Sequence, residues 1–316
     1  MNIKHSLVIP CFNEEGNVEI FFRAAKEAMQ GYTESFELIF VNDGSRDRTG
    51  EVLKKLFNEN KDVKIKVINF SRNFGKEAAM YAGLNASSGE YTTIIDADMQ
   101  QRPEVAVQMG KILDMNPEYD MVAAFQEKRK DGKFLSKVKT SFYSIINKVS
   151  EVHLIEDASD FRTMRRNVVQ SILDLTEYHR FSKGIFSWIG YNTCSIPYQV
   201  MERESGETKW SMKKLIKYAL DGIMAYTDLP LKLPMYFGIG TAIFDVFLLI
   251  FTIIRDLFSQ ITDYTTHYII CLILFLFSLL SIFMGFMGNY IGKIHTQVKN
   301  RPVYIAKEIL TYEENK

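Results

Sequence analysis

Short β-rich apolar runs alternate with helical patterns through the first 115 residues, and this alternation limits the fold more than any other feature. The apolar runs cover about residues 5–9, 36–42, 63–70 and 91–95, and the helical patterns cover about 15–30, 47–59, 75–86 and 103–115. Such alternation predicts an α/β fold built from parallel βαβ units. Ligands of such sheets bind at the carboxyl ends of the strands, so the loops after the strands are where chemistry is expected.

The chain changes character after about residue 230, where long apolar runs begin. Residues 234–254 and 268–291 are almost wholly apolar, and the first run as a helix would rise about 30 Å, the hydrocarbon thickness of a bilayer. A buried helix of a soluble protein is the alternative, but two such runs in succession favour a two-helix membrane anchor over residues 231–292. Asp245, inside the first run, should then face another helix or a wet cavity.

Cations flank the two apolar runs. The linker between them holds Arg255 as its cation, whereas the outer flanks hold Lys209, Lys213, Lys214, Lys217 and Lys232 on one side and Lys293, Lys299, Arg301 and Lys307 on the other. The positive-inside rule therefore predicts a multi-pass protein of the cell (inner or plasma) membrane. Residues 1–230 would form a cytoplasmic domain and residues 293–316 a cytoplasmic tail.

Two further segments have amphipathic patterns, at about residues 133–150 and 209–227. Each is either a surface helix packed on a core or a helix lying at the bilayer surface with its cations toward lipid phosphate. Gly285, Gly288 and Gly292 allow close helix contact, which leaves a homo-oligomer open.

The charges balance, with 38 Lys and Arg against 38 Asp and Glu. A nucleic-acid partner needs a basic field, so none is expected.

Asp96-Ala97-Asp98 follows the run at 91–95 and is the strongest local signal. Two carboxylates at a strand end can chelate a hard divalent cation, Mg²⁺ or Mn²⁺, that also bridges a diphosphate. Gln100 could add a neutral oxygen ligand. The plain alternative is a polar turn.

Three other strand-end loops carry polar residues. Asp43 can accept a hydrogen bond from a base N–H or a ribose hydroxyl, and Ser45 or Asp47 can cap the following helix. Asn13 is either part of the same site or the cap of the first helix. Glu14 and Glu15 would lie beside Asp43, and Lys76 in the third loop either meets phosphate charge or balances these acids.

Seven sequence segments occur in a characteristic order: PCFNEE (10–15), VNDGSRDRT (41–49), SRNFGKEAA (71–79), DADMQ (96–100), ASDFR (158–162), RFSKG with WIG (180–190) and RESGETKWS (203–211). Together they resemble the family 2 glycosyltransferases with a GT-A (Rossmann-like) fold. The polyprenyl-phosphate branch, which includes dolichyl-phosphate mannose synthase and bacterial GtrB-type enzymes, is most similar. The resemblance covers about residues 5–225 and the paired C-terminal spans. Many members have an acid where this chain has Gln101.

The resemblance implies inverting transfer of a sugar from a nucleotide-sugar to undecaprenyl or another polyprenyl phosphate, a lipid-linked donor for cell-envelope glycosylation. Asp96, Asp98 and Gln100 would hold the metal, and Asp98 and Asp160 would be the catalytic residues. The residues that the resemblance implies for nucleotide binding are Pro10, Asn13, Glu14, Glu15, Asp43, Lys76 and Asp96. Positioning of the acceptor or sugar is the favoured role for Asp160, with general-base catalysis second. The acceptor phosphate would meet Arg129, Lys137, Ser141 and Arg162.

UDP-glucose or UDP-N-acetylglucosamine is the favoured donor, with GDP-mannose as the alternative. A processive polysaccharide synthase is disfavoured, because Gln199 and Arg203 do not match its QxxRW motif and two spans cannot enclose a channel. A non-catalytic membrane scaffold is disfavoured because Asp43, Asp96 and Asp98 are all present.

Overall fold

The computed structural model describes residues 3–126, 158–178, 180–199 and 265–312, with isolated helical positions between 236 and 254. The amphipathic segments at 133–150 and 209–227 lie outside the described residues, as does most of the first predicted span.

The first part of the chain forms the predicted βαβ units. Its strands are β1 (His5–Cys11), β2 (Phe36–Asn42), β3 (Lys64–Phe70) and β4 (Tyr91–Ile94). Its helices are α1 (Val18–Gln30), α2 (Thr49–Glu59), α3 (Lys76–Ala86) and α4 (Pro103–Met115). Every residue of β2 is buried, as expected for a strand covered on both faces.

The remaining elements extend the sheet in both directions. They are β5 (Met121–Gln126), β6 (Ala158–Arg165), α6 (Arg166–Asp174), α7 (Ser182–Trp188), β7 (Thr193–Tyr198), α10 (Thr265–Val298) and β8 (Ala306–Thr311). The strand order is β7-β5-β6-β4-β1-β2-β3-β8. The expected parallel direction holds for β1 to β4 and also for β5 and β7, whereas β6 runs antiparallel to β4 and β5, and β8 runs antiparallel to β3.

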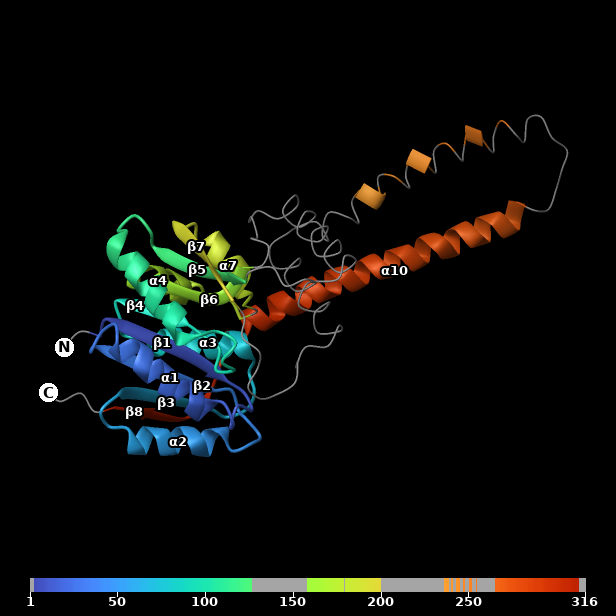
Figure 1. Ribbon diagram of the computed structural model, residues 1–316. Coiled ribbons are helices and arrows are strands. Elements are labelled where there is room, and N and C mark those ends of the chain that lie inside the picture. Colours follow the sequence, from blue (N-terminus) through green and yellow to red (C-terminus); the bar gives the residue numbers. More distant parts are fainter. Residues whose placement is uncertain are drawn as a thin grey trace.

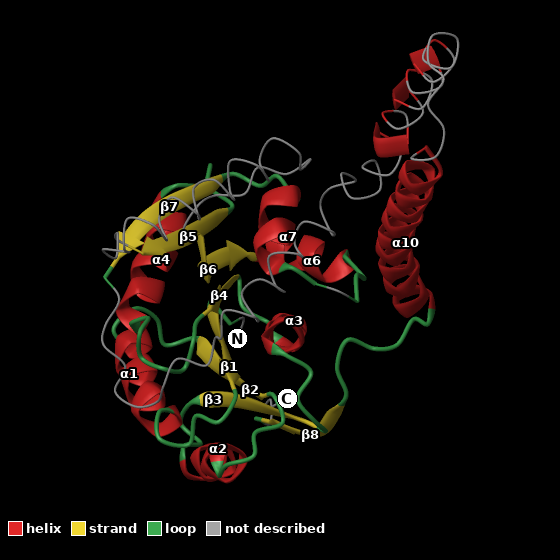
Figure 2. Cartoon of the chain, turned by 90° about the vertical axis from the view of Figure 1, so that its right-hand side faces the viewer, coloured by secondary structure: helices red, strands yellow, loops and turns green. Residues whose placement is uncertain are grey.

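Two helix layers cover the sheet (Figure 2). On one face, α1, α2 and α4 pack Phe21, Leu53 and Met109 against the strands. On the other, α3, α6 and α7 pack small and branched side chains, including Ala79 and Val169, against Val8 and its neighbours. Burial of these apolar surfaces holds the three-layer arrangement together.

The C-terminal residues, predicted to form a tail, contribute the end of α10 and the strand β8. The helix α10 extends away from the sheet (Figure 1), and the chain after it returns as β8 to pair with β3, for example Ile309 with Ile68. Within the described residues, no helix combines the length and the hydropathy needed to cross a membrane.

Candidate functional site

Lys76, Asp96 and Asp160 meet where β4 and β6 lie side by side. Lys76 Nζ lies 2.7 Å from Asp96 Oδ1 and 3.4 Å from Asp160 Oδ2. The pairing explains the meeting of the two acids: Ile94 faces Arg162 in the antiparallel register, so two residues further on Asp96 comes opposite Asp160. Lys76 is the first residue of α3 and reaches both acids from the neighbouring loop.

Asp160 is held as a carboxylate. Burial alone would raise its pKa, but the charges of Lys76, Lys183 and Arg162 outweigh burial and hold the pKa below its ordinary value. Its Oδ1 is buried and has no hydrogen-bond partner among the described residues. A charged oxygen in that state is costly in a purely structural role, which marks Asp160 as a candidate for function.

Arg162 lies two residues further along β6 and is only 4% exposed. Its guanidinium lies 3.5 Å from the centre of the Phe186 ring and donates to the carbonyl of Ser159 at 2.8 Å. Burial lowers its pKa to about 10, with the charge of Asp160 opposing that shift. Arg162 supplies positive charge to Asp160, and its predicted contact with an acceptor phosphate stays a prediction.

Gln101, which stands where many family members have an acid, shapes the loop after β4. The side chain of Gln101 accepts a hydrogen bond from Asp96 N at 2.9 Å and donates one to Asp96 Oδ2 at 3.4 Å. Met99 adopts a left-handed conformation with φ of 61°, and Asp98 accepts a hydrogen bond from Gln100 N. The neutral amide of Gln101 therefore positions Asp96, and a carboxylate there could not donate to it.

The structure describes no cluster of three or more His, Cys, Asp or Glu side chains arranged to hold a metal ion. The predicted set of Asp96, Asp98 and Gln100 contains two acids and one amide.

The loops after β1 and β2 are joined by hydrogen bonds. Asn13 donates from its backbone N to Ser45 Oγ, and its Oδ1 accepts from Arg46 N at 2.8 Å. Asn13 therefore does not cap α1, which begins at Val18. The N-cap residue of α2 is Arg48 and not Ser45 or Asp47, although Asp47 Oδ1 accepts a hydrogen bond from the backbone N of Thr49, the first residue of the helix.

The predicted nucleotide residues nearest to Asn13 also join these loops. Glu14 accepts from Asn17 Nδ2 at 2.6 Å, and Glu15 accepts from Arg48 N at 2.9 Å. Pro10 lies within β1 opposite Val41. These residues sit at the predicted sheet edge, where they organise the backbone that a nucleotide would approach.

Asp43 is 3% exposed and its carboxylate organises the loop after β3. It accepts hydrogen bonds from Asn73 Nδ2 and from the backbone N–H groups of Phe74 and Gly75. Burial raises its pKa, and these bonds together with Arg72 work against that rise. A nucleoside bound by Asp43 would have to share the carboxylate oxygens that already accept hydrogen bonds from the loop leading to Lys76.

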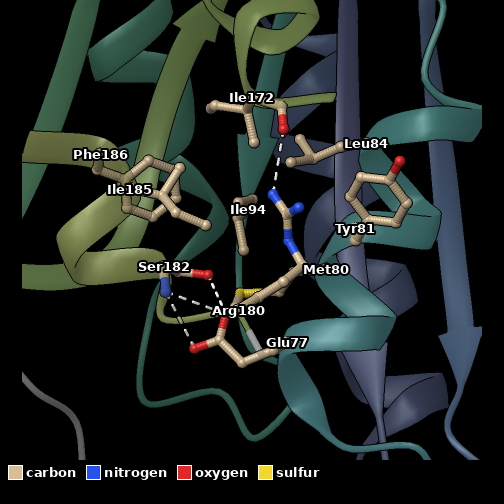
Figure 3. A pocket seen from close by; sticks show the side chains of 10 residues that line it. All are labelled: Glu77, Met80, Tyr81, Leu84, Ile94, Ile172, Arg180, Ser182, Ile185 and Phe186. Carbon is tan, nitrogen blue, oxygen red and sulfur yellow. Dashed lines mark hydrogen bonds between the residues drawn. The ribbon is translucent and has the colours of Figure 1, made fainter. Parts of the chain in front are cut away.

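Behind the acid cluster, Glu77 joins α3 to α7 (Figure 3). Its carboxylate accepts hydrogen bonds from the backbone N and the hydroxyl of Ser182. Burial, followed by the negative charge of Asp160, raises the pKa of Glu77 to about 7. The same residues line a small cavity with apolar side chains such as Ile94 and Phe186. Both residues lie in family motifs, but no sequence pattern indicated that Glu77 and Ser182 would bond to each other.

Arg129, Lys137 and Ser141, the other residues predicted to bind an acceptor phosphate, lie outside the described residues.

The comparisons with known proteins agree with this geometry. The family described as "Glycosyl transferase family 2" matches residues 6–173, which include Asp43, Lys76, Asp96 and Asp160. The chain belongs to glycosyl transferase family 2. The match confirms the family that the strand-end motifs predicted.

Curated relatives of this glycosyltransferase match it over nearly the whole chain. A prophage SfII-derived bactoprenol glucosyl transferase of Shigella flexneri is 36% identical over 311 residues, covering 97% of this chain and 98% of the relative. A glycosyltransferase of Bacillus subtilis called YkcC is also 36% identical, covering 97% of this chain and 94% of the relative. The resemblance to the polyprenyl-phosphate branch is thereby confirmed.

A solved structure supports the fold. Glucosyl-3-phosphoglycerate synthase from Mycobacterium tuberculosis, solved with Mn²⁺, UDP and phosphoglyceric acid, is 16% identical with a TM-score of 0.50, over 70% of this chain and 76% of that chain. The GT-A-like α/β fold with a mixed sheet is therefore established for this glycosyltransferase.

Proposed function

We propose that this enzyme transfers a sugar from a nucleotide-sugar to polyprenyl phosphate with inversion at the sugar carbon. The observation that carries the proposal is the meeting of Lys76, Asp96 and Asp160 at the ends of β4 and β6. It gains support from the similarity of nearly the whole chain to bactoprenol glucosyl transferases. That similarity favours UDP-glucose as the donor, ahead of UDP-N-acetylglucosamine, with GDP-mannose as the alternative.

The residues present fit a divalent cation. Carboxylate and amide oxygens are the ligands that Mg²⁺ and Mn²⁺ take, and Asp96, Asp98 and Gln100 offer three of them within one loop. The Asp96 side chain is about 30% exposed, so its carboxylate is accessible from the loop side. When bound, the cation supplies positive charge that stabilises the departing diphosphate.

The chemistry of the acceptor assigns a role to Asp160. A phosphate monoester has its second pKa near about 6, so at neutral pH it is already largely a dianion and needs little help from a base. Asp160, itself a carboxylate, is therefore better suited to orient the sugar or to hold Lys76 than to remove a proton. Lys76 brings positive charge between two acids that would otherwise repel the incoming phosphate.

We also propose that residues 234–254 and 268–291 anchor the enzyme in the cell membrane, with the catalytic domain in the cytoplasm. The support is the apolar sequence of both runs and the exposure of apolar side chains on α10, where Ile273, Phe275 and Phe277 are each more than half exposed. Large exposed apolar surfaces mark contact with a membrane or another protein.

A donor panel tests the function. Membranes carrying the enzyme are incubated with undecaprenyl phosphate and radiolabelled UDP-glucose, UDP-N-acetylglucosamine or GDP-mannose, and label in the lipid extract is counted. We expect UDP-glucose to give the strongest lipid labelling, and Asp98→Asn to abolish it while the protein still inserts into the membrane. Absence of lipid labelling with every donor would overturn the proposal.

A further inference from the structure

The end of α10 is fastened to the catalytic domain by one side chain. Gln297 Nε2 donates to the carbonyl of Thr176 at 3.0 Å, and Gln297 Oε1 accepts from Tyr178 N at 2.8 Å. Thr176 and Tyr178 lie in the connection between α6 and α7. Both ends of the amide are used, so the contact fixes an orientation as well as a distance.

Seven residues further on, Tyr304 makes a second attachment. Its ring stacks on Phe70 with centres 4.9 Å apart and an interplanar angle of 19°, and it meets Tyr81 of α3 edge-on at 6.5 Å. The carbonyl of Ile305 accepts a hydrogen bond from Ser71 N at 3.0 Å. Phe70 and Ser71 begin the loop that ends at Lys76, and β8 follows directly.

The two attachments act on the loops that carry the site. Arg180 donates to the carbonyls of Leu175 and Ile172 and lies 4.5 Å from the centre of the Tyr81 ring, between the two attachments. Two residues later, Ser182 bonds to Glu77, the neighbour of Lys76 (Figure 3). Residues 297–306, here called the docking segment, thus contact the loop that leads to Lys76 and the connection between α6 and α7, which continues to Ser182 and its partner Glu77.

We propose that the docking segment positions the catalytic domain relative to the bilayer, so that the Lys76–Asp96–Asp160 site reaches a polyprenyl phosphate held in the membrane. The inference rests on the proposed function and concerns Gln297 and Tyr304 as positioning residues. The seven residues between α10 and β8, if undocked and flexible, would have a root-mean-square span of about 15 Å. Such freedom would lower the effective concentration of the site at the lipid headgroup.

The test compares two acceptors, of which only the first requires the catalytic domain to be oriented toward the bilayer. One is undecaprenyl phosphate in phosphatidylethanolamine and phosphatidylglycerol vesicles that also hold the full-length enzyme. The other is citronellyl phosphate, a short polyprenyl phosphate dispersed in water. Gln297→Ala removes both hydrogen bonds, and Gln297→Glu keeps the acceptor for Tyr178 N but sets a carboxylate against the Thr176 carbonyl.

Both Gln297 variants should raise the KM for the vesicle-held acceptor about 10-fold, while the kcat with citronellyl phosphate stays within about twofold of the wild type. Tyr304→Ala should act in the same direction. Gln170→Ala is the matched control, because that glutamine is exposed and its amide bonds only to Asp174 in its own helix. Tyr304→Phe keeps the stacking ring and should match the wild type.

Equal losses with both acceptors would overturn the proposal, because they would indicate a general structural role. Unchanged KM for the vesicle-held acceptor in Gln297→Ala would also overturn it. Failure of the wild type with both acceptors would instead refute the proposed function, and the two failures are therefore distinguishable.

Discussion

Two acids at opposite ends of the strands show how differently one chemical group is treated in the same sheet. Glu37, at the amino end of β2, is completely buried and accepts hydrogen bonds from Ser6, Ser88, Lys66 and Tyr312. Asp160, at the carboxyl edge, has one buried oxygen with no partner among the described residues. A satisfied acid holds structure, and an unsatisfied one is held ready for a ligand.

The pKa shifts have different sources at the two edges. At Glu37, burial would raise the pKa, but hydrogen bonds from Ser6, Lys66 and Ser88 lower it overall. At Asp160, burial is opposed mainly by the charges of Lys76, Lys183 and Arg162. At Asp160 these charges leave Oδ1 open, whereas at Glu37 hydrogen bonds occupy both oxygens. The comparison therefore predicts that changes at Asp160 reduce activity and changes at Glu37 reduce stability.

The largest effect should come from Asp160→Asn, which keeps the shape of the side chain and removes its charge. We expect transfer to undecaprenyl phosphate to fall about 10³-fold, with the protein still folded at the assay temperature. Asp174→Asn, an exposed acid on α6, is the control and should retain full activity. If Asp160→Asn impaired folding but kept full activity per folded molecule, Asp160 would have a structural role and not a functional one.

Glu37→Gln should instead destabilise the protein by about 3–5 kcal/mol, because it leaves the ammonium group of Lys66 buried without its opposite charge. The measurement is chemical or thermal unfolding of the purified enzyme in detergent. Activity per folded molecule at low temperature should match the wild type. A fully active and fully stable variant would show that Glu37 is dispensable.

The pKa of Glu77 predicts how the folding stability of the protein depends on pH. This pKa rises from 4.5 to about 7 on folding, so between these values the folded state binds the proton that the unfolded state has lost. Folding stability should therefore fall as pH rises from about 4.5 to 7, by on the order of 3 kcal/mol. Glu77→Gln should remove this part of the slope, and identical pH profiles for the two proteins would contradict the assignment.

The smallest effect is expected at Gln101, which touches Asp96 but no substrate. Gln101→Ala should lower kcat about 10-fold, because Asp96 loses the side chain that holds its backbone N–H and one carboxylate oxygen. Stability should change little. An unchanged kcat would show that the loop after β4 holds Asp96 without Gln101.

Sequence patterns predicted the centre of the fold because each βαβ unit is local. The periods of β1 to β4 and of α1 to α4 are contained in short stretches, and the boundaries agree within three residues. The antiparallel pairing of β6 and β8 with their neighbouring strands could not be predicted in the same way, because it joins residues far apart in the chain. The Glu308–Lys54 ion pair, for example, crosses most of the sequence.

The site was predicted to a similar extent. Asp96 and Asp160 were identified by their motifs, but only the register of β4 against β6 brings them together. The bonding of Gln101 to Asp96 and of Glu77 to Ser182 depends on tertiary contacts that no spacing indicates. Arg162, predicted to contact the acceptor phosphate, is 4% exposed, and its place in a motif gave no indication of that burial.

The most direct test of the central claim is transfer of radiolabel from UDP-glucose to undecaprenyl phosphate by paired membranes of the wild type and of Asp96→Asn. We expect the wild type to give lipid-linked label that depends on added Mg²⁺ or Mn²⁺. At equal protein content, the lipid labelling by the variant should be lower by about 10²-fold or more. Equal lipid labelling by the two proteins would contradict it.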